Sequence, residues 1–326
     1  MKMDQQKQFV QDLKEKDQIK SIFIATDKTV LVDRNGKKYL SINLRDSTGA
    51  INGRLWDRVE DVENVFTSGD FVWVKGHVQI YQNRRQVIIH DLRKADTAEV
   101  NFDNFINGTD RKIDDLWNDF IEFIHSIKNT HIAQLLKLTV NDEKNANQIK
   151  QAPAAKSIHH AYMGGLLEHI VSICQLMNFL ASHYKNLDRD LLLFGAIFHD
   201  IGKIEELQLD AGIQYSSKGR LVGHMGIACE FIDKYSSQIL GFPEELKNIL
   251  KHIVLSHHGK LEYGSPKEPS FPEAIVVAMV DDLDSKLNTI FSFMEDELEG
   301  GESWTRYHQG FDRYFYLEIF KKMKEQ

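Results

Sequence analysis

The hydrophobic pattern of this chain changes character near residue 100. From residue 19 to about residue 94, short apolar runs alternate with polar residues, a pattern typical of β-strands. From Ile113 onward, apolar residues recur every three or four positions, as they do in amphipathic helices. Because one segment cannot satisfy both periods, the sequence predicts a multidomain α+β protein, with a sheet domain followed by an all-α domain.

Five strands are expected in the first part, with a short helix over residues 59–66 between the third and the fourth. Turn signals at Asn35-Gly36 and Thr48-Gly49 separate the first three runs. The expected strands cover residues 19–33, 39–46, 51–56, 71–81 and 86–93. This element order is that of an OB-fold, a small β-barrel whose outer face binds single-stranded nucleic acid.

Composition and period together suggest the domain boundaries. The residues between the two parts are rich in Asp, Asn, Thr and Gly and poor in apolar side chains, which indicates a linker. We expect a barrel domain over 1–94, a linker over 95–112, a helical connector over 113–156, the main helical domain over 157–298, and a tail over 299–326 that packs on the helical domain.

The charge is unevenly distributed along the chain. The formal net charge is −8, but residues 1–100 carry 17 Lys and Arg against 15 Asp and Glu. The two cysteines, Cys174 and Cys229, lie in apolar helical surroundings and predict reduced core residues of a cytoplasmic protein. No apolar run of membrane-spanning length and no apolar signal core at the start are evident, so no membrane association is expected.

A buried run ends in two polar side chains at His199-Asp200. Placing an unpaired imidazole and carboxylate together in a core is costly, whereas a divalent cation satisfies both at once. The alternative is that His199 caps the end of its helix and Asp200 pairs with Lys203. Taken alone, this stretch therefore leaves metal binding open.

Further histidines and an aspartate recur at intervals of about 20 to 35 residues. Each has an alternative explanation, because a histidine on an apolar helix face can be a hydrogen-bonded core residue. Together, however, each lies on the apolar side or at the end of a separate expected helix, which is how a helical bundle gathers ligands at one point. The set is His169, His199, Asp200, His224, His257, His258 and Asp281.

The order His, His-Asp, His, His-His, Asp resembles the HD-domain metal-dependent phosphohydrolases in their two-metal form. The resemblance implies that one cation is held by the set His169, His199, Asp200 and Asp281. It implies a second cation at His224, His257 and His258, with Asp200 bridging. The choice of Asp281 over its neighbours rests on this resemblance, and Asp284, one turn further on, is the first alternative.

Imidazole and carboxylate ligands suit Mn²⁺, our first expectation, and also Co²⁺, Fe²⁺ or Mg²⁺. Two such ions about 3.5–4 Å apart lower the pKa of a shared water toward about 7 and hold a phosphodiester for in-line displacement. Asp200 would be central to catalysis. Lys203 would stabilise charge on the phosphoryl oxygens, unless it is a lysine favoured by a helix C-terminus. His160 is the candidate for protonating the leaving oxygen.

Residues 39–56 resemble the OB-folds of tRNA-anticodon and replication proteins. Candidate residues for stacking on bases are Phe23, Trp56 and Tyr81, although each could instead belong to the barrel core. Candidate phosphate contacts are Lys75, Arg84 and Arg85. Such groups bind backbone and base faces, so they predict little sequence preference.

An OB-fold followed by the motif at residues 159–169 and an HD domain resembles the YhaM family of bacterial 3′→5′ exoribonucleases, from about residue 10 to 320. Ile170-Val171 departs from the pattern, which carries Thr or Ser after the histidine. The resemblance implies metal-dependent 3′→5′ hydrolysis of single-stranded RNA, and also of single-stranded DNA, to nucleoside monophosphates.

Two other functions remain open from the residues alone. One is an HD phosphohydrolase of small or cyclic nucleotides, and the other is a non-catalytic RNA-binding metalloprotein. A homo-oligomer also stays open, because the apolar helix faces of residues 113–140 and the aromatic stretch of residues 304–317 could pair between copies or simply cover the core of the helical domain.

Overall fold

The computed structural model describes residues 7–33, 35–81, 84–96, 99–100, 104–105, 111–155, 164–210, 212–298 and 301–324. The chain forms two compact units. The barrel unit comprises Met1–Asn107, Asp210–Gly212 and Thr289–Gln326, and the helical unit comprises Gly108–Leu209 and Ile213–Asn288. The predicted fold class, an OB-fold barrel followed by a helical domain, is confirmed, although a short two-stranded sheet within residues 207–215 interrupts the helices that were expected to be all-α.

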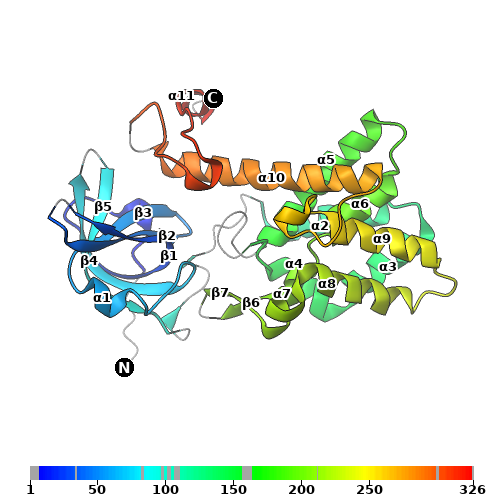
Figure 1. Ribbon diagram of the computed structural model, residues 1–326, viewed down its shortest axis with the longest axis horizontal. Helices are drawn as coiled ribbons and strands as arrows, with labels where there is room; N and C mark the ends of the chain where they lie inside the picture. Colours follow the sequence, from blue (N-terminus) through cyan, green and yellow to red (C-terminus); the bar gives the residue numbers. More distant parts are fainter. Residues whose placement is uncertain are drawn as a thin grey trace. The chain divides into compact units, whose positions relative to one another are not determined.

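Five strands close into a barrel in the order β1-β2-β3-β5-β4 (Figure 1). Closure occurs because β1 pairs with β2 through its second half and with β4 through its first half. Strands β3 and β5 pair in parallel, and the other neighbours are antiparallel. The strands are β1 Gln18–Val32, β2 Lys38–Asp46, β3 Gly49–Leu55, β4 Phe71–Tyr81 and β5 Arg84–Lys94, with the helix α1 Val59–Val62 after β3.

Phe23 belongs to the interior of this barrel, so the expectation that it stacks on a base is wrong. Its side chain is 0% exposed and lies among the buried residues of the barrel core. The burial of β1 alternates with a period of two, and Phe23 falls on the inward phase. A period-two pattern gives two faces but does not say which one is inside.

The residues after Thr289 belong to the barrel unit, whereas we expected residues 299–326 to pack on the helical domain. Glu297 is 6% exposed and accepts hydrogen bonds from Arg84 of β5 and from Arg306. Asp296 lies 3.9 Å from Arg45 of β2. Carboxylates that end α10 therefore pair with arginines of the barrel and of the tail, a complementarity that hydrophobic patterning does not reveal.

The helical unit has one continuous core. The sequence places apolar residues on one face of most of these helices, and α6 and the first half of α5 are buried almost all round. The elements are α2 Ile113–His125, α3 Thr130–Asn141, α4 Glu143–Gln151, α5 Gly165–His183, α6 Arg189–Phe198, α7 Lys203–Glu206, β6 Leu207–Asp210, β7 Gly212–Tyr215, α8 Ser217–Ser236, α9 Glu244–Ser256 and α10 Pro272–Asp296. The last turns of α10 belong to the barrel unit, which α11 Glu318–Lys324 completes.

Two helices differ from their expected character. Helix α4 lies at the polar end of the expected helical connector; the Asp142 side chain caps it by accepting from the Asn145 amide, and Ile149 is buried. Within the described residues, α5 alone reaches the length and hydropathy of a membrane-spanning helix. Half of that apolar window is buried inside the protein, so the core accounts for its composition.

Replacing Phe23 by alanine tests its assignment to the core. We expect Phe23→Ala to lower the free energy of unfolding by about 3–5 kcal/mol, because it leaves a cavity in the barrel. Tyr81→Ala is the matched control: this side chain is 50% exposed, and its removal should change stability by less than about 0.5 kcal/mol. Chemical denaturation of both variants measures the difference. Unchanged stability in Phe23→Ala together with weaker RNA binding would restore the stacking role.

Candidate metal centre and nucleic-acid groove

Two glycines bring the polar residues of the helical unit together. Helix α6 ends at Phe198, so His199 and Asp200 follow it directly. A Cβ on Gly202 would lie 2.0 Å from the carbonyl oxygen of His224, so only glycine permits this close approach. Gly223 has φ 74°, a left-handed conformation that kinks α8 immediately before His224. These two glycines allow His224 to lie close to Asp200.

The first cluster consists of His169 from α5, His199 and Asp200 after α6, and Asp281 from α10. The Nε2 atom of His169 lies 3.3 Å from Nε2 of His199 and 3.2 Å from Oδ1 of Asp281. Asp200 Oδ2 lies 3.5 Å from the His199 Nε2 and 3.8 Å from the His169 Nε2. Three separate chain segments thus direct four side chains at one point.

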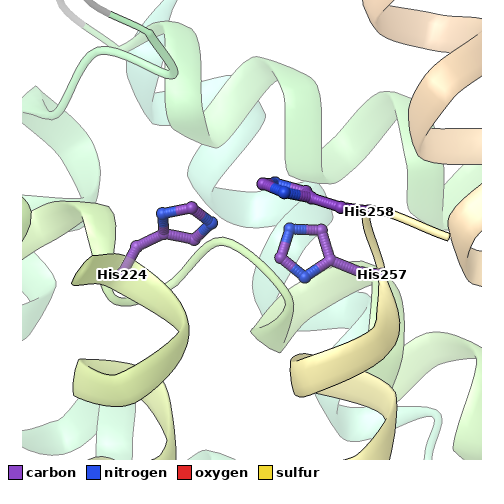
Figure 2. A group of neighbouring side chains, drawn as sticks. All are labelled: His224, His257 and His258. Carbon is purple, nitrogen blue, oxygen red and sulfur yellow. The ribbon is translucent and has the colours of Figure 1, made fainter. Parts of the chain in front are cut away.

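The second cluster consists of His224, His257 and His258, whose rings face one another across a small gap (Figure 2). One nitrogen of each ring lies within 4.8 Å of those of the other two. The second oxygen of Asp200, Oδ1, lies 3.6 Å from Nε2 of His224 and 3.7 Å from Nε2 of His257. Asp200 therefore offers one oxygen to each cluster.

All five clustered histidines hold Nδ1 against an oxygen. His199 donates to the carbonyls of Gly195 and Ala196, and His169 donates to Asp284, which also accepts from Ser172. The remaining contacts are His224 with Glu206, His257 with the carbonyl of Val254, and His258 with the carbonyl of Tyr263. A proton fixed on Nδ1 leaves the Nε2 lone pair free to bind a metal.

This arrangement fits a cation at each cluster. Among the described residues, Asp200 Oδ1, His224 Nε2 and His257 Nε2 are buried atoms with no hydrogen-bond partner. Unsatisfied buried polar atoms are costly, and these three are acceptors aimed at one place. In the first cluster, two Nε2 lone pairs at 3.3 Å repel each other unless a positive charge lies between them.

The protonation of His199 in the metal-free protein also indicates that the first cluster is stabilised by positive charge. Burial alone would lower the pKa of the His199 imidazole, but the carboxylates of Asp200 and Asp281 outweigh it and raise that pKa to about 10. Burial lowers the pKa of His257 well below its usual value, and that of His258 is lowered too. Those two rings are therefore neutral and ready to bind metal.

Glu206 and Asp284 support the clusters from behind. Glu206 accepts from both the amide and the Nδ1 of His224, and its pKa is held below its usual value: burial opposes this, but the bond to His224 outweighs it. Sequence reasoning missed Glu206 and considered Asp284 only as a substitute for Asp281. The signal available for Glu206 was weak, a carboxylate three residues after Lys203 with no apolar run around it.

Lys203 lies beside the shared carboxylate, with Nζ 2.5 Å from Oδ2 of Asp200. It is the first residue of the four-residue helix α7. Burial would lower its pKa, but Asp200 raises it further, so the ammonium stays charged. His160, the expected proton donor, lies outside the described residues.

The barrel unit carries a groove of about 1010 Å³, here called the barrel groove. The outer faces of β2, β3 and β5 form one side of it. Of the six residues expected to bind nucleic acid, Tyr81, Arg84 and Arg85 line the groove, whereas Trp56 and Lys75 are not among its lining residues and Phe23 is in the core. Trp56 stacks on Tyr39 at 4.4 Å, and Lys75 is exposed on β4. The lining residues include Ser41, Asn43, Asn52 and Arg54.

Comparison with known proteins agrees with both units. Residues 166–286 match the HD domain family, and residues 16–95 match the OB-fold nucleic acid binding domain. The chain is 33% identical over 307 residues to the 3′-5′ exoribonuclease YhaM of Bacillus subtilis, covering 94% of this chain and 96% of that protein. The chain belongs to the YhaM family. A second YhaM relative, from Geobacillus, is 34% identical over 90% of this chain and 89% of its own length.

Membership in the YhaM family, together with the HD domain, implies dependence on a divalent metal ion. The seven residues that we assigned as ligands all lie in the two clusters. Asp281, not Asp284, faces the centre of the first cluster, since Asp284 contacts the far side of the His169 ring.

Removing the Glu206 carboxylate charge should weaken metal binding without touching a ligand. We expect Glu206→Gln to lower the affinity for Mn²⁺ by about 10- to 100-fold, because His224 loses the acceptor that orients it. The matched control is Glu205→Gln: Glu205 pairs with Lys218 and has no contact with the clustered histidines. Titration calorimetry of metal-free protein measures both. Equal affinities in the two variants would contradict the role of Glu206.

The pH dependence of the metal-free protein follows from His199. Its pKa is about 10 in the folded chain and about 6.5 when unfolded, so its stabilising contribution is complete below about pH 6.5 and is lost as pH rises toward 10. With EDTA present, the melting temperature should therefore fall from pH 6.5 to 9.5. His199→Gln, which cannot titrate, should show a flatter profile. Mn²⁺ affinity should rise over the same range, since the cation replaces that proton.

Proposed function

We propose that this chain is a metal-dependent 3′→5′ exonuclease that hydrolyses single-stranded RNA, and also single-stranded DNA, to nucleoside monophosphates. One observation carries the proposal. Five histidines with Nδ1 hydrogen-bonded and Nε2 facing inward surround a single aspartate that serves both clusters. The HD-type centre occurs in one chain with an OB-fold, so hydrolysis is combined with single-strand binding.

We propose two ions, with Mn²⁺ as the first candidate and Co²⁺, Fe²⁺ or Mg²⁺ as alternatives. His169, His199 and Asp281 would hold one, His224, His257 and His258 the other, and Asp200 both. When bound, such a pair supplies a nucleophilic water near neutral pH and clamps the phosphate. The absence of thiolate ligands favours these harder ions over ions that prefer sulfur.

Residues of the chain itself would orient and stabilise the phosphate. The Lys203 ammonium is held next to Asp200 in a nearly buried position, where a positive charge acts strongly on phosphoryl oxygens. Ser172 and Asp284 fix the ring of His169, and Glu206 fixes that of His224. These contacts limit the movement of the ligands, so the site is organised before substrate arrives.

The barrel groove would hold the body of the strand while its 3′ end reaches the metal centre. Arg54, Arg84 and Arg85 supply positive charge, and the exposed ring of Tyr81 supplies a surface for a base. Stacking and phosphate contacts are indifferent to base identity, which suits an enzyme that processes mixed sequences. Both cysteines are free thiols, in keeping with a cytoplasmic protein, which we also propose.

An end-labelled single-stranded RNA tests the proposal directly. With Mn²⁺, a 3′-labelled oligomer should release labelled mononucleotide at once, whereas a 5′-labelled one should shorten stepwise. EDTA should stop both reactions. Asp200→Asn should lower kcat by more than about 10³-fold, because both ions lose a ligand. Asp282→Asn is the control, since this exposed side chain pairs with Lys286 away from the clusters.

Three results would contradict the proposal. Cleavage that persists in EDTA would exclude a metal-dependent centre. An intact oligomer after tight binding in Mn²⁺ would favour a non-catalytic RNA-binding metalloprotein. Turnover of cyclic nucleotides or nucleoside triphosphates with a higher kcat/KM than that of the oligomer would favour a small-nucleotide phosphohydrolase.

A further inference from the structure

Residues 301–324, here called the C-terminal segment, expose four aromatic rings in the barrel unit. Trp304 and Tyr316 face each other across an antiparallel β-bridge, with ring centroids 5.1 Å apart. Tyr307 and Tyr314 form a second pair at 5.2 Å. These rings are 55%, 45%, 43% and 57% exposed in that order, which is unusual for side chains of this size in a hydrogen-bonded turn.

The first pair lies beside residues of the segment that line the barrel groove. Glu302 and Arg306 line the groove. Trp304 lies two residues from each of them along the chain and is exposed, whereas its neighbour Thr305 is 4% exposed. The groove thus has a wall from β2, β3 and β5 and a second wall from the C-terminal segment.

Glu297 fastens this second wall to the barrel. Its Oε2 accepts from Arg84 of β5 at 3.1 Å and from the backbone amide of Arg306 at 3.1 Å, and its Oε1 lies 3.2 Å from the Arg306 guanidinium. Arg306 also lies 3.7 Å from Asp27 of β1. The Trp304 end of the segment is held in place relative to the strands, as a preformed binding surface must be.

The charge of the segment favours nucleic acid over an acidic or purely apolar partner. It carries Arg306, Arg313, Lys321, Lys322 and Lys324 against Glu302, Asp312 and Glu318. This local excess of positive charge stands out in a chain whose net charge is −8. Exposed aromatic rings flanked by basic side chains are the combination that binds single strands without sequence preference.

We propose that the C-terminal segment is the second wall of the single-strand groove, with Trp304 and Tyr316 as a platform on which a base stacks. The ligand class is single-stranded RNA or DNA of mixed sequence. The inference deepens the proposed function and rests on it, because it adds a second contact surface for the substrate strand. This surface lies about 250 residues along the chain from the barrel strands that form the first wall.

Binding measured without turnover tests the platform. Fluorescence anisotropy in EDTA gives the Kd of a labelled, unstructured RNA oligomer for the full-length protein. Trp304→Ala and Tyr316→Ala should each weaken binding by about 5- to 100-fold. Trp304→Phe, which keeps a stacking face, should bind within about threefold of the unchanged protein. Phe179→Ala is the control, since it removes an exposed ring, 65% accessible, from the helical unit.

Hydrolysis of a dinucleotide in Mn²⁺ separates this inference from the proposed function. A dinucleotide offers the metal centre one phosphodiester and no strand for a groove to hold, so its hydrolysis by the unchanged protein reports the metal centre alone. Suppose that the unchanged protein does not hydrolyse the dinucleotide, while the Kd values of the variants for RNA still follow the expected order. In that case only the exonuclease proposal is contradicted. If the alanine variants bind RNA as the unchanged protein does, the platform is wrong.

Two further measurements guard against indirect effects. Photocrosslinking of 5-iodouridine RNA to the unchanged protein should label Trp304 or Tyr316, and labelling confined to other residues would overturn the proposal even if the alanine variants fail to fold. Light scattering reports the oligomeric state. A change of mass in Trp304→Ala, with the Kd per protomer unaltered, would show that the rings instead join two copies of the chain.

Discussion

The candidate site depends on one carboxylate that serves two groups of histidines. Asp200 Oδ2 faces the first cluster and Oδ1 faces the second, so the two halves of the site share their central ligand. A buried carboxylate among imidazoles is tolerable only if its charge is compensated, and here Lys203 and the clustered rings do so. The close approach at Gly202 and the kink at Gly223 bring His224 to this residue.

Much of this architecture follows from residue patterns. The change from a period of two to a period of 3.6 marks the two units. His257 and His258 lie just beyond the end of α9, which agrees with the expectation that the ligands lie at helix ends or on apolar faces. A buried charge needs a partner whatever the fold, which is why His199-Asp200 and Asp281 could be singled out. Helix α4 lies within the expected helical connector, but its bounds could not be read because its few apolar residues, such as Ile149, give little periodic signal.

The features that could not be predicted from the sequence are mostly contacts between polar residues that lie far apart in the chain. Glu206 and Asp284 orient His224 and His169 only in the folded chain, and no local sequence pattern predicts these contacts. The inward phase of β1 decides that Phe23 is core, and alternation alone leaves the two phases equivalent. The placement of Glu297 against Arg84 joins residues more than two hundred positions apart.

The composition of the barrel unit has a consequence for folding. It is assembled from Met1–Asn107 and from Thr289–Gln326, so the helical unit is an insertion between them. Joining the two pieces while the insertion is unfolded means closing a loop of about 180 residues, which costs on the order of 4–5 kcal/mol in chain entropy. Folding of the insertion first shortens the unfolded chain that must be closed and so lowers this cost. The second wall of the groove should therefore form late, since it joins residues more than two hundred positions apart in the sequence.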